Sequence, residues 1–148
     1  MTALVVVTGS ARSGRGALAI ALAERLGCAF VSVDEIAEEL RLGAAETPTE
    51  WLRLDVEAET VRRLDAFAGT AVLDVEVTPA AVARLVELLA PWSATMVEVR
   101  CSPGDRPGGP ALGAARTVVV DTSRPLELGD VVTAVRGETG ARRVVRRH

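Results

Sequence analysis

The segment GSARSGRG, residues 9–16, combines closely spaced glycines with hydroxyl and arginine side chains. It follows an apolar run and precedes a segment with the apolar spacing of a helix. Consecutive backbone N–H groups in such a turn form a concave site for an anion, and the positive end of the helix dipole adds to the attraction. The spacing therefore predicts a turn that binds phosphate. The candidate phosphate-binding residues are Gly9, Ser10, Ala11, Arg12, Ser13, Gly14, Arg15 and Gly16.

Two positions of this loop differ from the pattern G-x-x-x-x-G-K-[ST] of phosphate-binding loops. Arg15 stands in place of the lysine, and its guanidinium keeps the charge but is longer, planar and forked. Gly16 stands where a serine or threonine hydroxyl group ligates Mg²⁺. We expect the main chain to bind an anion despite both changes, whereas Gly16 argues against tight Mg²⁺ binding. The alternative is a glycine-rich turn that binds nothing.

Apolar runs rich in β-branched residues alternate along the chain with segments of helical period, which is typical of an α/β protein with a parallel sheet. We expect a three-layer α/β/α sandwich around a five-stranded parallel sheet. The predicted strands are 3–9, 29–33, 70–77, 94–101 and 116–122. The predicted helices include about 14–26, a segment from 78 to Pro91, and about 126–136.

A further helix is predicted after residue 46. The hydroxyl group of Thr47 can cap it, Pro48 suits its first turn, and Glu50 completes a capping box. The side chains predicted to face inward are Trp51, Leu54, Val61 and Leu64.

The composition limits the classes of protein to be considered. A chain of 148 residues with 49% hydrophobic content suits one domain, placed at residues 1–137, followed by a basic tail at 138–148. The net charge of −3 argues against nucleic acid as a partner, and no apolar run is long enough for a membrane span. We therefore expect a cytoplasmic protein without membrane association.

Three further features of the composition concern chemistry. Cys28 and Cys101 are expected to be reduced packing residues, and His148 is the only histidine, which argues against histidine catalysis and histidine metal sites. The chain has no lysine, so a coding bias could place arginine at position 15. Such a bias does not explain Gly16, because serine and threonine are common elsewhere in the sequence.

Beyond the loop, several segments resemble the small P-loop kinases of the adenylate-kinase, shikimate-kinase and zeta-toxin type. FVSVDEIAEELRLG (30–43) is similar to the second strand and following helix of that group, and VLDVEV (72–77) to its third strand. MVEVRCSP (96–103) and VVVDTSRPLELGDVVTAV (118–135) are similar to its last two strands and final helix. The resemblance implies a P-loop NTPase fold of the nucleoside-kinase type over residues 3–136, with the Asp-Thr-Ser stretch near the nucleotide base.

The resemblance also implies roles for carboxylates at strand ends, which lie beside the phosphate crevice of a parallel sheet. Asp34 would orient and deprotonate the hydroxyl group that accepts phosphate, and Asp74 would hold Mg²⁺ through water. The alternative for Asp34 is that it only caps the helix EIAEEL. Glu76 could share the metal role, although a solvent-facing strand end is the interpretation that we favour for it.

Kinases of this type carry a helical lid after the fourth strand, with arginines that clamp the phosphoryl group. The corresponding segment here, SPGDRPGGPALGAA (102–115), is rich in glycine and proline and predicts an irregular loop with a reduced or absent lid. Arg106 and Arg116 are the basic candidates for phosphate contact in this region. Without a lid, the exclusion of water and the stabilisation of charge both weaken.

Three functions remain open from the sequence. We favour a kinase-like protein that binds ATP, GTP or another small phosphorylated ligand with impaired or no phosphoryl transfer, since the loop lysine, the hydroxyl residue and the lid are altered together. The first alternative is an active ATP- or GTP-dependent kinase of a small molecule or nucleotide that uses Mg²⁺. The second is an interaction module in which the basic tail binds an acidic protein partner or RNA, although the tail lacks the aromatic residues typical of specific single-strand recognition.

Overall fold

The computed structural model describes residues 3–10, 13–43, 49–104 and 112–137. Along the chain, its elements are β1 (Leu4–Thr8), α1 (Arg15–Leu26), β2 (Ala29–Ser32), α2 (Val33–Gly43), α3 (Thr49–Asp65), β3 (Ala71–Asp74), α4 (Val82–Leu89), the 3-10 helix η1 (Ala90–Thr95), β4 (Met96–Ser102), β5 (Arg116–Asp121) and α5 (Leu128–Arg136). The predicted basic tail, residues 138–148, lies outside these ranges.

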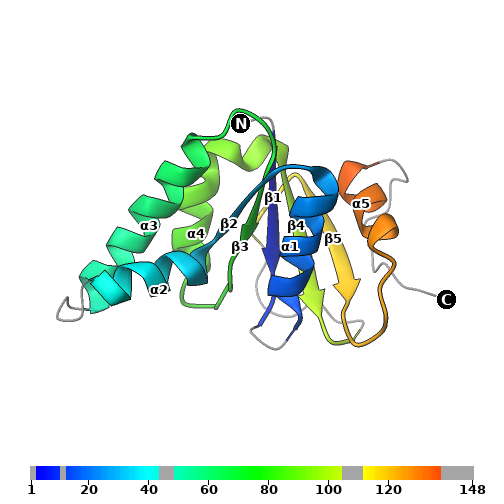
Figure 1. Cartoon of the computed structure of the whole chain (residues 1–148), viewed down its shortest axis with the longest axis horizontal. Helices are drawn as coiled ribbons and strands as arrows, with labels where there is room; N and C mark the ends of the chain where they lie inside the picture. Colours follow the sequence, from blue (N-terminus) through cyan, green and yellow to red (C-terminus); the bar gives the residue numbers. More distant parts are fainter. Residues whose placement is uncertain (1–2, 11–12, 44–48, 105–111, 138–148) are drawn as a thin grey trace.

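The five strands form one parallel sheet in the order β2-β3-β1-β4-β5. This finding confirms the predicted α/β fold with a five-stranded parallel sheet. Because the strands all run the same way, their carboxyl ends lie along one edge of the sheet, near the bottom of Figure 1. The turn that follows the central strand β1 therefore starts between the ends of β3 and β4.

Helices cover both faces of this sheet and enclose two apolar cores (Figure 1). The side chains of β1 alternate between them, since Val5 and Val7 pack with α1 and α5, whereas Leu4 and Val6 pack with α2, α3 and α4. All residues of β1 and β3 are buried, as expected for parallel strands covered on both faces. The arrangement is the predicted three-layer α/β/α sandwich.

The helix predicted to begin at residue 78 begins later. The backbone N–H groups of Ala81 and Val82 both donate to the carbonyl oxygen of Thr78, and this turn precedes α4. At its other end, α4 passes into η1, which extends to Thr95. The strand predicted from residue 94 consequently starts at Met96.

The predicted inward face of α3 is wrong in its first turns. Trp51 is 66% exposed and Leu54 is 45% exposed. Figure 1 shows α2 and the start of α3 projecting away from the sheet beyond β2, so the first turns of α3 have no sheet to pack against. The buried side chains of α3 are Val56, Thr60 and Leu64. The predicted capping residues Thr47 and Pro48 lie outside the described residues.

Both cysteines are free thiols that contribute to packing, as predicted. Cys101 is buried in the core beneath α1 and α5, and Cys28 is half-buried at the margin of that core. No helix in the described ranges has both the length and the apolar character needed to cross a bilayer.

Gly9 joins β1 to the turn that precedes α1, and its backbone conformation suits glycine. Its φ of +146° lies in a region that residues with a Cβ atom rarely adopt. A Cβ atom at this position would lie 2.5 Å from Ser13 Oγ and 2.7 Å from the carbonyl oxygen of Cys101 in β4. The absence of a side chain at Gly9 therefore lets the turn pack closely against the end of β4.

We expect Gly9→Ala to lower the free energy of unfolding by about 3 kcal/mol, because the added methyl group combines an unfavourable φ with a clash against β4. Gly27→Ala is the matched control, since Gly27 has a φ of +62° but no atom within 4 Å of its missing Cβ. The control should cost about 1 kcal/mol. Urea denaturation followed by circular dichroism measures both values. Equal losses would show that the contact with β4 does not constrain the turn.

Candidate functional site

The turn between β1 and α1 is tightly closed on itself. Ser13 is buried, and both its backbone N–H and its hydroxyl group donate to the carbonyl oxygen of Ser10, at 3.1 Å and 2.6 Å. Gly14 follows with a φ of +78° and forms the N-cap of α1. The predicted loop residues Ala11 and Arg12 lie outside the described residues. The other predicted loop residues are brought together at the start of α1.

The first turn of α1 presents backbone donors next to Gly14. An α-helix leaves its first N–H groups without acceptors inside the helix, and no described side chain caps those of α1. The first turn of α1 contains no acidic residue that would offset the positive end of the helix dipole. Gly14 and Ala17 are exposed. This end of α1 is therefore suited to contact with an anion.

Arg15 does not extend into solvent but is folded into the protein, with only 4% of its surface exposed. Its Nη2 donates a hydrogen bond to Asp34 Oδ2 at 2.8 Å. Its Nε lies 2.8 Å from Asp74 Oδ1, yet the two atoms are not aligned for a hydrogen bond. Nη1 is also buried and makes no hydrogen bond to a described residue. The guanidinium thus joins two carboxylates and leaves several of its donors unused.

Asp34 is placed for this contact by the way in which α2 begins. Helix α2 starts at Val33, directly after β2, and the hydroxyl oxygen of Ser32 accepts a hydrogen bond from the N–H of Glu35. Ser32 therefore supplies the cap of the first turn, and the interpretation of Asp34 as only a helix cap is wrong. The carboxylate of Asp34 instead contacts Arg15 and remains 69% exposed.

Asp74 ends β3 and is nearly buried beneath the first turn of α1. Burial raises the pKa of its carboxyl group most strongly, the charge of Arg15 lowers the pKa, and the negative charges of Asp34 and Glu35 raise it again. The net shift is upward. A Cβ atom at Gly16 would lie 3.7 Å from Asp74 Oδ2, so the position that lacks a hydroxyl group directly faces this carboxylate.

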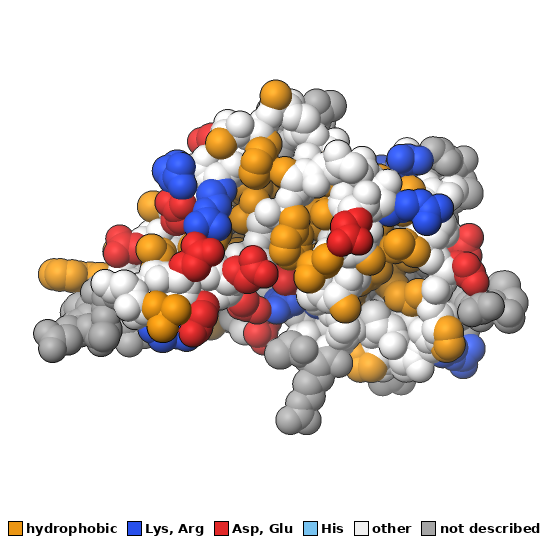
Figure 2. All heavy atoms as spheres, in the orientation of Figure 1, with side chains coloured by type: hydrophobic (Ala, Val, Ile, Leu, Met, Phe, Trp, Pro, Cys, Tyr) orange, Lys and Arg blue, Asp and Glu red, His pale blue; other side chains and the backbone are white. Residues whose placement is uncertain are grey.

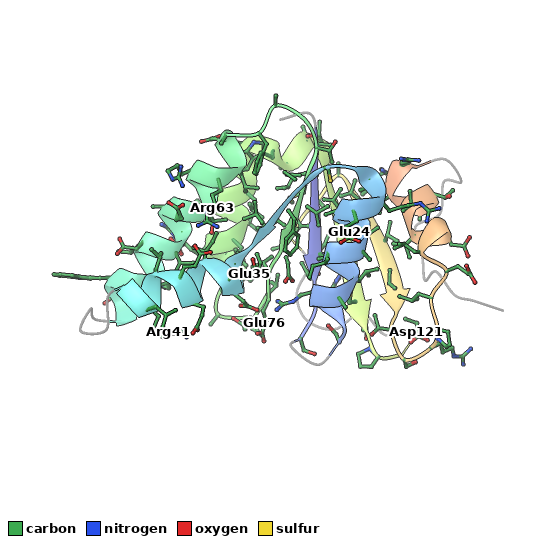
Figure 3. The ribbon with its side chains drawn as sticks, in the orientation of Figure 1. Glu24, Glu35, Arg41, Arg63, Glu76 and Asp121 are labelled. Atoms are coloured by element: carbon green, nitrogen blue, oxygen red, sulfur yellow. The ribbon has the colours of Figure 1, made fainter. Side chains whose placement is uncertain are left out.

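Acidic side chains surround the approach to Arg15. Figure 2 shows acidic groups gathered between α2 and α1 on the face nearest the viewer. Glu35 in the first turn of α2 and Glu76 after the end of β3 lie beside this gap in Figure 3, and both are exposed. The solvent-facing position of Glu76 is the one favoured from the sequence. Arg15 is thus a cation in a predominantly negative environment.

The residues present at this point do not fit a resident Mg²⁺ ion. The two carboxylates that face the loop, Asp34 and Asp74, already contact the guanidinium of Arg15, and Gly16 supplies no side-chain oxygen. In the ranges that the structure describes, no cluster of three or more ligating His, Cys, Asp or Glu side chains is present.

Arg116 does not lie at the loop. It begins β5, at the opposite edge of the sheet, and its guanidinium donates to the carbonyl oxygens of Ala134 and Val135 at the end of α5. The final turn of a helix has carbonyl groups without partners and a negative dipole end, so Arg116 stabilises that end. Its predicted phosphate contact is not supported by this position. Arg106 lies outside the described residues.

The Asp-Thr-Ser stretch, residues 121–123, begins at the last residue of β5 and lies beside the loop, while its expected place near a nucleotide base stays a prediction. A Cβ atom at Gly14 would lie 3.8 Å from the Cβ of Thr122. Asp121 Oδ1 accepts hydrogen bonds from the N–H groups of Gly104, at 2.9 Å, and Ser123, at 3.0 Å, and also from the hydroxyl group of Ser123. Asp121 therefore ties the segment after β4 to the segment after β5, a role that the sequence analysis did not assign to it.

A cleft of about 380 Å³ lies between α2, α3, α4 and the end of β3. It adjoins the carboxylate site, because Val33 and Val75, the neighbours of Asp34 and Asp74, line it. Arg84 of α4 donates to Glu57 of α3 at 2.9 Å at its rim. The sequence carries no signal for this cleft, since its walls come from helices whose packing no local pattern indicates.

No family model matches the sequence, and no curated protein is significantly similar to it. Solved structures with a similar fold include two proteins. A protein of Chloroflexus aurantiacus J-10-fl described as a "putative kinase" is 20% identical, with a TM-score of 0.64 over 95% of this chain and 97% of the other. A gluconokinase from Sinorhizobium meliloti 1021 is 20% identical, with a TM-score of 0.53 over 90% of this chain and 89% of the other. The chain therefore shares its α/β fold with these two proteins.

We expect Asp121→Asn to lower the melting temperature at pH 7. Hydrogen bonds from Ser123 and Gly104 lower the pKa of the Asp121 carboxyl group, so its ionised form stabilises the folded state above the pKa of the unfolded chain, about 4. This contribution is lost as the pH falls through the lower folded-state pKa. Calorimetric melting temperatures should therefore differ at pH 7 and approach one another as the pH falls below about 4. The exposed Asp55→Asn should change little at either pH, and a pH-independent difference for Asp121→Asn would contradict the explanation.

Proposed function

We propose that this chain binds ATP, GTP or another small phosphorylated ligand at the turn before α1 and that it transfers the phosphoryl group poorly or not at all. The observation that carries the proposal is the position of Arg15, buried at the start of α1 between Asp34 and Asp74. The kinase-like fold supports a nucleotide or a small molecule as the ligand.

Two sets of donors support the binding of phosphate. The first turn of α1 has backbone N–H groups with no described side-chain cap, and it lies next to the exposed Gly14. The second set is the guanidinium of Arg15, which lies in the same turn and has buried donors without described hydrogen-bond partners. The backbone donors are fixed in position before a ligand arrives, and Asp74 holds Arg15 near the same turn, so little ordering is needed on binding.

The same contacts argue against efficient phosphoryl transfer. A general base must accept a proton from the acceptor hydroxyl group, but Oδ2 of Asp34 accepts a hydrogen bond from Arg15. Asp74, the candidate metal-side carboxylate, also faces the guanidinium. Gly16 lacks the hydroxyl ligand that positions Mg²⁺ on the transferred phosphate in kinases of this fold.

The cleft beside Asp34 favours a second candidate function. Its volume of about 380 Å³ suits a small acceptor, and it lies between the carboxylate site and the helices α3 and α4. If Arg15 left Asp34 when ATP bound, the carboxylate would be free to act on a hydroxyl group held in this cleft. An active kinase of a small hydroxylated molecule is therefore the alternative to be tested.

We expect Ala17→Glu to weaken the binding of ATP at least about tenfold, which corresponds to about 1.4 kcal/mol. Ala17 is exposed in the first turn of α1, so a negative charge there would repel phosphate while interacting favourably with the helix dipole. Ala17→Gln is the matched control and should bind like the wild type. Isothermal titration calorimetry with ATP and with GTP measures affinity, and thermal unfolding checks that the Glu variant keeps its stability.

Two results would contradict the proposal in different ways. Failure of the wild type to bind ATP, GTP or pyrophosphate would remove the binding function and leave the interaction module as the alternative. Multiple turnovers of ATP in the presence of Mg²⁺ and a mixture of small hydroxylated acceptors would establish the active kinase instead. We expect binding without such turnover.

A further inference from the structure

The geometry points to Arg15 as the resident cation of this site: its guanidinium takes the place of a divalent metal, and Asp34 is a latch that releases it to a ligand phosphate. This inference rests on the proposed function, because it concerns how the same turn binds its phosphorylated ligand. It adds that polyphosphate binding needs no Mg²⁺ and that a carboxylate of the protein competes with the ligand for Arg15.

The two carboxylates hold Arg15 unequally. The side chain of Asp74 is 7% exposed, whereas that of Asp34 is 69% exposed. Water competes with and screens an ion pair to an exposed carboxylate, but separating a buried pair leaves a charge inside the protein. Asp34 is therefore the partner that Arg15 exchanges for a ligand, and Asp74 is the partner that keeps the guanidinium near the turn.

Arg15 has donors that its resting contacts do not use. A guanidinium carries five N–H donors, and Nη2 to Asp34 is the hydrogen bond that it makes with a described residue. Nε and Nη1 are buried without such a bond. Phosphate oxygens pair with the planar fork of a guanidinium through parallel hydrogen bonds. A phosphate group at the start of α1 would satisfy donors that are otherwise buried and unused.

A metal ion and Arg15 exclude one another at this place. The positive charge of the guanidinium already lies against Asp34 and Asp74, and a divalent cation between them would be repelled by it. Gly16 also lacks the side-chain oxygen that would favour binding of the metal over the guanidinium. The substitution of both loop residues is thus consistent with one change, the replacement of a bound metal by a side-chain cation.

The first test compares the wild type with Asp34→Asn, with inorganic pyrophosphate as the probe. Isothermal titration calorimetry is carried out in EDTA and repeated with Mg²⁺, at about 0.15 M salt, where the Debye length is about 8 Å. We expect the wild type to bind in EDTA with an affinity that Mg²⁺ does not increase. Asp34→Asn should bind about fivefold more tightly, because the amide holds Arg15 less strongly than the carboxylate does.

Glu35→Gln is the matched control for charge. Glu35 is the next residue in the same exposed first turn of α2, and no hydrogen bond or ion pair joins its side chain to Arg15 in the described residues. Its neutralisation also removes one negative charge from the first turn of α2 but leaves the latch intact. We expect its affinity to change less than about twofold at this ionic strength.

The second test restores the conventional residues in the double variant Arg15→Lys, Gly16→Ser. The added side chain fits, since a Cβ at position 16 would lie 3.7 Å from Asp74 Oδ2, an ordinary contact distance. With a hydroxyl ligand facing Asp74 and no guanidinium between the carboxylates, pyrophosphate affinity should now rise about tenfold on addition of Mg²⁺.

The outcomes separate this inference from the proposed function. If neither the wild type nor Asp34→Asn binds pyrophosphate or ATP, both fall. If the wild type binds only with Mg²⁺, or if Asp34→Asn binds no more tightly than the wild type, only the inference falls. An equal gain in pyrophosphate affinity in Glu35→Gln would show that the loss of any nearby negative charge has the same effect as the loss of Asp34, which contradicts the latch. Pyrophosphate binding by the double variant that does not depend on Mg²⁺ would show that Arg15 does not replace the metal.

Discussion

The ion pair that joins Arg15 to Asp34 and Asp74 is the interaction on which the site depends. It connects the first turn of α1 with the start of α2 and the end of β3, at one edge of the sheet. A buried guanidinium requires negative partners, and the nearly buried Asp74 in turn requires a positive one. Removal of Arg15 would leave Asp74 as an uncompensated buried charge, and removal of Asp74 would leave Arg15 with the exposed Asp34 as its one carboxylate partner among the described residues. The site is therefore organised around charges that belong to the protein itself.

The sheet order explains why these three side chains meet. β3 lies between β1 and β2, and Val7 of β1 is in register with Asp74. Asp74 therefore ends its strand beside the turn, while Asp34 follows the next strand over. One guanidinium spans the two carboxylates, with Nη2 on one and Nε near the other. The forked shape of arginine suits this bridge better than the single ammonium group of lysine, which gives position 15 a physical reason beyond a bias in composition.

The sequence predicted the sheet, its parallel direction and a glycine-containing turn between β1 and α1, because buried strands, glycines and helical spacing are local signals. It also placed Asp34 and Asp74 at the carboxyl ends of strands, which lie along one edge of a parallel sheet. It did not predict the bridge through Arg15, since the direction of a long side chain depends on what surrounds it. The position of the Arg116 side chain was not foreseen for the same reason. Its guanidinium binds the carbonyl groups at the end of α5, which have no partners within the helix. The exposure of the Trp51 side chain was not predicted, because helical spacing does not show where a sheet ends.

The incomplete hydrogen bonding of Arg15 is difficult to explain by stability alone. Each buried donor without a partner costs about 1–3 kcal/mol, which is substantial beside a total stability of about 5–15 kcal/mol for a typical domain. Replacing a buried charge and its partners with apolar side chains is often neutral or stabilising, so a turn that served only to connect β1 with α1 could omit all three charges. Their presence beside the turn, with donors in excess and an exposed partner, is consistent with the proposed anionic ligand, which would complete the set.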